Sequence, residues 1–273
     1  MEYSMNIRGQ LFSLAEPVVM GILNVTPDSF YAGSRKQTEQ EIAERAQQIV
    51  AEGGQIIDVG AFSTRPGAQE VPEEEELRRL RTALQIVRRE VPDVPVSVDT
   101  YRPVVARHCV EDWGADIVND VSEGGRTGIV GQPIEVEGSM FQTVAQLGVP
   151  YILMSVQPTV EDMMKAWASD IEQLRAMGQK DIILDPGFGF GKTVDENFTV
   201  MSRLEQLAAF ELPVLVGISR KSMIWKTLGS NATEALNGTT ALHAVALLKG
   251  ASILRVHDVR EAVETVTLLR KML

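Results

Sequence analysis

Eight short apolar runs, each followed by a polar or glycine-rich segment, constrain the fold of this chain more than any other feature. The runs cover residues 18–23, 56–59, 94–98, 117–118, 151–154, 182–184, 214–216 and 253–254. They are rich in Val, Ile and Leu, which is typical of strands buried on both faces. Segments with helical periodicity separate most of them, as at residues 77–87 and 242–249. The pattern predicts a parallel sheet covered by helices.

The number of strand–helix units favours one particular architecture. Eight units within 273 residues favour a closed (β/α)8 barrel, a TIM barrel, as a single domain over residues 1–273. An open, doubly wound sheet is the alternative, because strand closure is not visible in a sequence. Residues 1–17 form a lead-in that could pair as a hairpin over one end of the barrel.

Charge and cysteine content exclude several classes of function. The chain carries 26 Lys and Arg against 37 Asp and Glu, a net charge of −11 that opposes nonspecific binding to nucleic acid or membrane. Its apolar runs are too short to cross a bilayer, and residues 1–16 lack the apolar core of a signal peptide. The single cysteine, Cys109, excludes an intrachain disulfide and a thiolate metal cluster. We therefore expect a soluble, cytoplasmic protein that acts on small molecules.

Standard hydrolase and zinc motifs are absent from the sequence. It contains neither a GxSxG elbow nor an HExxH pattern, and of its three histidines only His257 follows a predicted strand. The four consecutive glutamates at residues 73–76 begin a predicted helix. We interpret them as a solvated first turn favoured by the helix dipole rather than as a metal site.

A glycine-rich loop follows the sixth predicted strand and reads Asp-Pro-Gly-Phe-Gly-Phe-Gly-Lys-Thr over residues 185–193. Two nucleotide-binding patterns nearly fit it. A Walker A loop ending at Thr193 requires glycine at Pro186, and a GxGxxG from Gly187 requires glycine at Lys192. The spacing therefore argues against a nucleotide cradle, and leaves either another ligand site or a tight turn without a ligand.

Positive charges gather after several predicted strands. These residues are Arg65, Arg220, Lys221, Arg255 and His257. In a closed barrel the residues beyond the strand ends share one opening, so an acidic protein could concentrate positive charge there. Phosphate or pyrophosphate would be the natural guest, and the short helix predicted after Ser222 offers free N–H groups to such an anion. The alternative for each charge is a solvated surface position.

Polar groups also end three apolar strands. Asp99, Asn119 and Asp185 would face one cavity in a barrel, as two carboxylates and one amide. Such a set matches a heterocycle that carries an amino group, a ring N–H and a carbonyl. The alternative is that each carboxylate caps the helix that follows it.

One connection does not fit the regular alternation. Residues 122–138 contain five glycines and make a longer link than is usual in compact domains. Either it is a loop at the barrel mouth, or it is an excursion without a function.

Taken together, these segments resemble one family closely, the dihydropteroate synthases of the folate pathway. The matching segments cover residues 21–30, 58–60, 63–67, 97–100, 119–120, 184–192, 219–222 and 255–258, in the order of the family. Each segment alone is weak evidence, whereas the ordered set is highly specific.

The resemblance implies a TIM barrel that joins a dihydropterin bearing a 6-hydroxymethyl pyrophosphate to p-aminobenzoate, with Mg²⁺ assistance and release of pyrophosphate. By matching positions, the pterin would be held by Asp99, Asn119, Met154, Asp185, Phe190 and Lys221. The p-aminobenzoate would be framed by Phe30, Thr64, Arg65, Pro66, Phe190 and Ser222. The pyrophosphate would be held by Asn24, Arg65, Arg255 and His257, with Asn24 as the metal ligand.

The same resemblance implies which groups are catalytic. They would be Asp99, Asp185, Lys221 and Arg65. Fixed cations and Mg²⁺ would stabilise the leaving pyrophosphate, and ionised Asp99 or Asp185 would stabilise positive charge in the pterin. The resemblance further implies a homodimer through the late helices, and a p-aminobenzoate site that sulfonamides mimic.

The chain departs from the family pattern at three places. Ala32 stands where an acidic residue is common, and Ala61-Phe62 stands where Gly-Glu is common. Ser155 follows Met154 where the family commonly has histidine. The departures bear on loop closure and catalytic rate more than on pterin binding.

Two other functions are compatible with parts of this pattern. A related barrel that transfers a methyl group from a reduced folate to a corrinoid partner would retain Asp99, Asn119 and Asp185. It does not need the cations at the strand ends, whose joint presence argues against it. A noncatalytic pterin-binding barrel is suggested by the altered loops.

Overall fold

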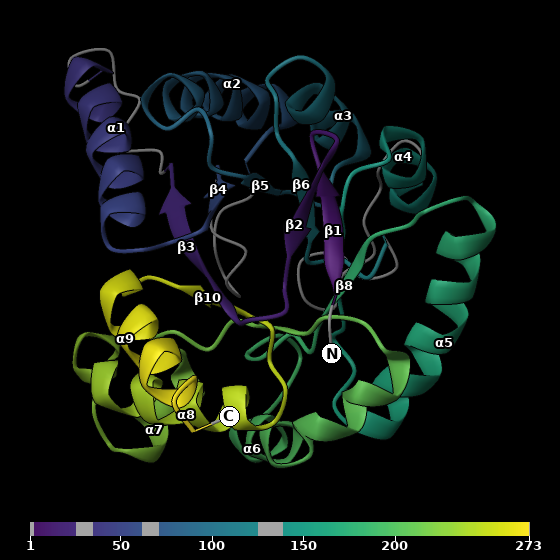
Figure 1. The fold of residues 1–273 in the computed structure, drawn as a ribbon, viewed down its shortest axis with the longest axis vertical. Helices are drawn as coiled ribbons and strands as arrows, with labels where there is room; N and C mark the ends of the chain where they lie inside the picture. Colours follow the sequence, from purple (N-terminus) through teal and green to yellow (C-terminus); the bar gives the residue numbers. More distant parts are fainter. Residues whose placement is uncertain (1–2, 26–34, 62–70, 125–138, 273) are drawn as a thin grey trace.

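The barrel predicted from the strand pattern is present and nearly closed. A computed structural model describes residues 3–25, 35–61, 71–124 and 139–272 (Figure 1). The barrel strands are β3 (Val18–Asn24), β4 (Ile56–Gly60), β5 (Val96–Asp99), β6 (Ile117–Asp120), β7 (Tyr151–Met154), β8 (Ile182–Asp185), β9 (Leu215–Val216) and β10 (Ile253–Val256). All pairings between them are parallel, in the order β8-β7-β6-β5-β4-β3-β10-β9.

The two ends of this sheet meet beside β8. Leu184 forms an isolated parallel bridge with Val214, and its N–H donates to the carbonyl of Pro213 at 2.9 Å. This contact excludes the open sheet that the sequence left as an alternative. Side chains that follow the carboxyl ends of the strands therefore share one rim.

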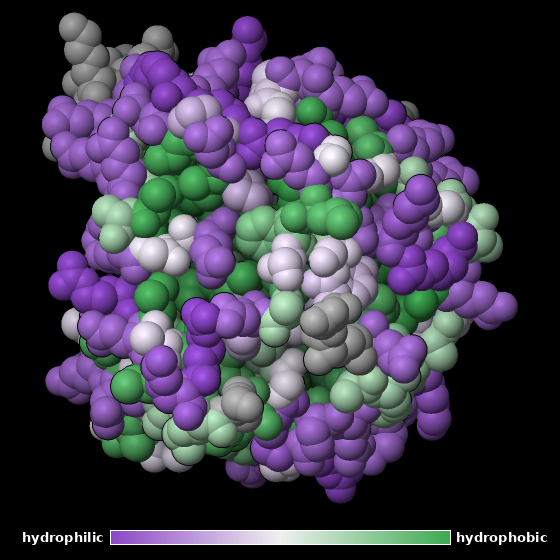
Figure 2. All heavy atoms as spheres, viewed as in Figure 1, coloured by the Kyte–Doolittle hydropathy of each residue, from purple (hydrophilic) through white to green (hydrophobic). Residues whose placement is uncertain are grey.

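Helices surround the strands (Figure 1). They are α1 (Arg35–Ala51), α2 (Glu73–Glu90), α3 (Pro103–Glu111), α4 (Met140–Leu147), α5 (Val160–Ala176), α6 (Val194–Ser202), α7 (Ser222–Thr227), α8 (Leu236–Leu248) and α9 (Val259–Leu269), with 3-10 turns η2 (Leu204–Phe210) and η3 (Ala232–Glu234). In Figure 2, hydrophilic side chains cover much of the surface, with hydrophobic ones between them. Of the helices in the described ranges, none is long and apolar enough to span a bilayer.

The start of α2 differs from the expected solvated turn. Glu76 is fully buried, where it accepts a hydrogen bond from Thr100 Oγ1 at 2.7 Å and pairs with Arg102. The prediction is wrong at this residue, because a buried guanidinium and hydroxyl replace the water that the carboxylate would otherwise require. Glu73 and Glu74 are exposed as expected.

A hairpin closes the amino-terminal end of the barrel, as the lead-in suggested. Strands β1 (Ser4–Ile7) and β2 (Gln10–Ser13) pair antiparallel. Both residues of the connecting turn have positive φ, 51° at Arg8 and 80° at Gly9, which is the conformation of a type I′ turn. Met5 is fully buried against interior strand residues such as Ile56 and Ile152, which places a hydrophobic plug at this end.

The barrel interior changes from apolar to polar along its axis. In the strand register Asp58 lies beside Ser97 and Asp99 lies beside Asn119, nearer the carboxyl ends than apolar residues such as Ile56. Apolar packing therefore fills the amino-terminal half, and hydrogen-bonding groups line the other half. That division positions the candidate site.

Candidate functional site at the strand ends

A partly buried arginine links two strand carboxylates inside the barrel. Arg255 on β10 donates from Nε to Asp58 Oδ2 on β4 at 2.6 Å, and from Nη2 to Asp99 Oδ2 on β5 at 2.8 Å. Asp58 is fully buried and Asp99 is 7% exposed. In the sheet order β3 lies between β10 and β4, and both β3 and β4 lie between β10 and β5, so the guanidinium reaches across the barrel interior to both carboxylates. Charge-assisted hydrogen bonds of this kind are short and strong.

Asn119 on β6 extends this cluster. Its Nδ2 lies 3.3 Å from Asp58 Oδ2. Within the described part of the chain, Asp99 Oδ1, Asn119 Oδ1 and Ser97 Oγ are buried without a hydrogen-bond partner. Buried polar atoms in proteins are normally hydrogen-bonded, so unmatched atoms on two adjacent strands indicate a place for a polar ligand or water.

Burial and neighbouring charges shift the pKa values of this cluster. Burial raises the pKa of Asp99 from 3.8 to about 7, although Arg255 opposes the rise. Burial also raises the pKa of Asp185, while Lys221 lowers it. Burial by itself would lower the pKa of Arg255, but Asp58 and Asp99 outweigh it and raise that pKa. A permanent cation thus lies beside a carboxyl group that changes protonation near neutral pH.

The glycine-rich loop after β8 is a tight turn held by its own lysine. Asp185 Oδ1 accepts from Gly187 N at 2.8 Å. Gly187 has φ of 65°, and a Cβ there would lie 2.1 Å from Ser155 O, so the position requires glycine. Lys192 Nζ donates to Gly187 O and Phe190 O, both at 3.2 Å. Lys192 therefore stabilises the loop from within.

Lys221 brings a second cation to the same rim. Its ammonium lies 4.6 Å from the centroid of the Phe190 ring, within cation–π distance, and it donates to Phe188 O. A Cβ on Gly189 would lie 3.1 Å from Lys221 Cδ, so glycine allows this close approach. The arrangement places a cation and an aromatic face beside Asp185.

Asn24 is exposed at the end of β3, across Gly60 from Asp99. A Cβ on Gly60 would lie 3.3 Å from Asn24 Oδ1 and 3.8 Å from Asp99 Oδ2, so glycine keeps the space between them open. Within residues 3–25, 35–61, 71–124 and 139–272, no group of three or more His, Cys, Asp or Glu could hold a metal ion. An amide oxygen that borders an open space is one of the ligand types that Mg²⁺ accepts alongside phosphate oxygens and water, so Asn24 is the described residue that would fit such an ion.

Arg220 does not contribute its charge to the opening, contrary to the sequence-based expectation. Its guanidinium donates to both carboxylate oxygens of Asp258, at 2.8 and 2.9 Å, and to Ala232 O at 3.0 Å. Asp258 precedes α9 and Ala232 begins η3, so the arginine joins these two segments. His257 precedes Asp258, and its backbone N–H donates to Ser219 Oγ at 3.2 Å.

The remaining residues predicted for the site divide into two groups. Met154 is fully buried on β7, with its Cγ 3.0 Å from the Cβ position of Gly187, and Ser222 begins α7. The others lie outside the described residues, namely Phe30, Thr64, Arg65 and Pro66, as do the departures at Ala32 and Phe62.

Sequence reasoning did not single out Ser97 of this cluster, nor Asp58, for which the sequence held the clearer signal. Asp58 lies inside an apolar run, two residues before the end of β4, whereas the expected polar groups were sought at strand ends. The available signal was an acidic residue within a strand that must be buried on both faces, since such a charge requires a buried partner.

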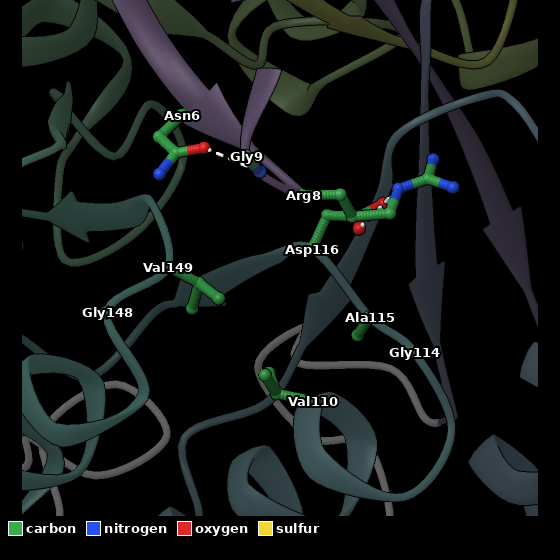
Figure 3. A pocket seen from close by; sticks show the side chains of 9 residues that line it. All are labelled: Asn6, Arg8, Gly9, Val110, Gly114, Ala115, Asp116, Gly148 and Val149. Atoms are coloured by element: carbon green, nitrogen blue, oxygen red, sulfur yellow. Dashed lines mark hydrogen bonds and ion pairs between the residues drawn. The ribbon is translucent and has the colours of Figure 1, made fainter. Parts of the chain in front are cut away.

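The cavity in Figure 3 lies at the other end of the barrel, near the starts of β6 and β7, and has a volume of about 300 Å³. Its lining consists of Asn6, Arg8, Gly9, Val110, Gly114, Ala115, Asp116, Gly148 and Val149. Arg8 Nε lies 3.1 Å from Asp116 Oδ1, and Asp116 Oδ2 accepts from Val96 N at 2.8 Å. These charged groups tie the hairpin to the barrel, so we interpret the cavity as a structural feature.

Similarity to known proteins agrees with this geometry. Residues 20–257 match the family described as pterin binding enzyme. The chain is 37% identical to dihydropteroate synthase of Escherichia coli K12 over 281 residues, covering 97% of this chain and 95% of that protein. It is 38% identical to the Streptococcus pyogenes serotype M3 dihydropteroate synthase, covering 93% and 95%.

Solved structures give the same result. A Xanthomonas albilineans dihydropteroate synthase with 4-aminobenzoic acid superimposes with a TM-score of 0.87 at 33% identity, covering 100% of this chain and 98% of that chain. A Yersinia pestis dihydropteroate synthase in complex with a sulfonamide drug has a TM-score of 0.85 at 35% identity, covering 99% of each chain.

Proposed function

We infer that this chain, which belongs to the dihydropteroate synthases of the pterin-binding enzyme family, binds its dihydropterin substrate at the strand-end cluster around Arg255. Its reaction is the condensation of 6-hydroxymethyl-7,8-dihydropterin pyrophosphate with p-aminobenzoate, which yields 7,8-dihydropteroate and pyrophosphate. The observation that carries the site assignment is the set of unmatched buried atoms beside Arg255, on Ser97, Asp99 and Asn119.

In this proposal the pterin ring occupies the polar half of the barrel. Asp99 and Asp185 accept hydrogen bonds from the amino and ring N–H groups, and Asn119 can both donate and accept. Lys221 donates to an acceptor of the ring, and Met154 packs against it. Apolar residues below the polar layer close the floor and exclude water.

Departure of pyrophosphate leaves positive charge on the pterin and negative charge on the leaving group. An ionised Asp99 or Asp185 stabilises the pterin cation through charge fixed in the folded protein. Arg255, His257 and Arg65 would stabilise the pyrophosphate. The amine of p-aminobenzoate is already a nucleophile, so no activated serine or cysteine is required.

The metal proposal concerns Asn24. Its amide oxygen would hold a Mg²⁺ ion together with the pyrophosphate oxygens and water. When bound, the metal would neutralise charge that develops on the leaving group. Gly60 leaves the required space beside Asn24.

The p-aminobenzoate would bind outside the pterin, against Phe190 and Ser222. Phe30, Thr64, Arg65 and Pro66 would complete this subsite. The relatives solved with 4-aminobenzoic acid and with a sulfonamide drug support the proposal. We accordingly expect sulfonamides to compete with p-aminobenzoate for this site.

A homodimer through the late helices also belongs to the proposal. Leu248 at the end of α8 and Leu268 on α9 are 55% and 70% exposed, and these two helices pack together. A dimer would cover such apolar side chains. Light scattering on the purified protein should give twice the 30.0 kDa chain mass.

The function is tested by measuring dihydropteroate and pyrophosphate formation by purified protein. We expect Arg255→Ala and Lys221→Ala each to lower kcat/KM at least about 100-fold, since each removes a part-buried cation and its charged hydrogen bonds. Lys180→Ala, at an exposed position, is the matched control. Product formation that survives either site substitution unchanged would refute the residue assignment.

A further inference from the structure

Glu123 is a buried residue held in an uncommon backbone conformation. It is 3% exposed and has φ of 52°, in the left-handed region that non-glycine residues seldom adopt. Asp120 holds the turn around it by accepting from Ser122 N at 2.8 Å and Gly124 N at 3.0 Å. Tyr151 Oη donates to the same carboxylate at 2.6 Å. Such conformations persist where the surroundings fix them, and they concentrate near functional sites.

The carboxylate of Glu123 binds the chain at the end of β7. Glu123 Oε1 accepts from Ser155 Oγ at 2.6 Å and from Val156 N at 3.0 Å. Ser155 is fully buried. A hydroxyl donor at this position thus pairs with a buried carboxylate, which also fixes the following peptide.

Segment 155–156 lies directly against the loop after β8. The Cβ position of Gly187 is 2.1 Å from Ser155 O, and that of Gly191 is 3.0 Å from Val156 O. Lys192 Nζ donates to Ser155 O at 3.1 Å while it also holds the loop carbonyls. A displacement of residues 155–156 must therefore displace the loop.

The loop after β8 also contacts Lys221, one of the residues proposed to bind substrate. Phe188 O accepts from Lys221 Nζ, and the Phe190 ring lies beneath the same ammonium. We propose that Glu123, Ser155 and Lys192 are positioning residues that fix the orientation of Phe190 and Lys221 for p-aminobenzoate and pterin binding. This inference rests on the substrate roles given above to Phe190 and Lys221.

The charge of Lys192 provides a readout that a purely structural role would not affect. Burial lowers the pKa of Lys192 to about 8, although Asp185 and Glu123 oppose the decrease. Deprotonation above that pH removes the charge from the three carbonyl contacts. The KM for p-aminobenzoate in the wild-type protein should consequently rise above about pH 8.

The experiment compares Lys192→Met, Glu123→Ala, Ser155→Ala and the conservative Glu123→Gln, using steady-state kinetics with p-aminobenzoate and fluorescence titration with the dihydropterin pyrophosphate. Loss of the charged hydrogen bonds of any one of these residues predicts at least about a tenfold higher KM for p-aminobenzoate, with kcat within about threefold of wild type. Glu123→Gln should restore most of the loss, because its amide oxygen still accepts from Ser155 and Val156. Exposed Lys165→Met and Ser169→Ala are the controls.

The outcomes separate this inference from the assigned function. The positioning role is supported if the KM of the wild-type protein increases at pH values above 8 and the KM of Lys192→Met does not change with pH. Unchanged KM values and pH profiles in folded variants, while Lys221→Ala still abolishes turnover, would overturn it and leave the function intact. If a variant fails to fold, the test uses the pH dependence of KM in the wild-type protein instead. A KM for p-aminobenzoate that stays constant between pH 7 and 9 would then contradict the inference.

Discussion

Arg255 Nε lies 2.6 Å from Asp58 Oδ2, although 197 residues separate the two in the chain. The carboxylate is fully buried, and the arginine side chain is 20% exposed. The same guanidinium also reaches Asp99. One cation therefore positions two carboxylates of the candidate site.

Replacement of Asp58 by asparagine should destabilise the protein. The change leaves Arg255 with one carboxylate partner and costs about 3 kcal/mol of unfolding free energy, as expected when one member of a buried ion pair is removed. Urea denaturation measures this, with exposed Asp93→Asn as the control. A loss equal to that of the control would contradict the prediction.

The stability of the folded protein should depend on pH through Asp99. This group keeps its proton up to about pH 7 when folded, whereas it releases the proton near 3.8 when unfolded. The contribution of Asp99 to the free energy of unfolding is therefore fully present below pH 3.8, and it is lost as the pH rises through 7. The difference in unfolding free energy between wild type and Asp99→Asn should decrease over that interval. A constant difference between pH 4 and 8 would exclude the shift.

Catalysis should respond to the same proton in the opposite sense. If ionised Asp99 stabilises the pterin cation, kcat/KM falls about tenfold per pH unit below about pH 7 and is level above it. The profile of Asp99→Asn should lack this inflection while retaining low activity. Equal inflections in both proteins would assign the titration to another group.

Gly187→Ala should be far more damaging than alanine at another glycine with similar φ. Its Cβ would overlap Ser155 O, so we expect a loss of about 3 kcal/mol and a large decrease in turnover. Gly148 also has φ of 65°, but among the described residues nothing lies within 4 Å of its Cβ position. Gly148→Ala should cost about 1 kcal/mol. Similar losses for the two variants would contradict the steric explanation.

His243 should make the protein less stable in acid. Burial lowers its pKa to about 4, so the folded protein holds it neutral while the unfolded chain protonates it below 6.5. Stability is lost as the pH falls from 6.5 toward 4. Wild type and His243→Leu should therefore differ in the slope of unfolding free energy over this range. Parallel slopes would show that the group titrates normally.

Several features were predictable because their physical cause is local. Near-continuous apolar runs identify buried parallel strands, and a polar residue that ends such a run identifies the active rim, as at Asp99, Asn119 and Asp185. The ordered motifs also identified the family. Glu76 and Arg220 were misjudged for the opposite reason, because their partners Arg102 and Asp258 lie in other segments.

The sequence by itself determined the alternation of strands and helices, the polar strand ends and the glycine-rich turn after the strand that ends at Asp185. Only the tertiary structure decided that β8 contacts the segment before β9. It also decided that Arg255 pairs with Asp58 as well as Asp99, and that Glu123 accepts a hydrogen bond from Ser155. Periodicity and turn chemistry act over a few residues, whereas the partner of a buried charge depends on which distant segments the closed barrel brings together.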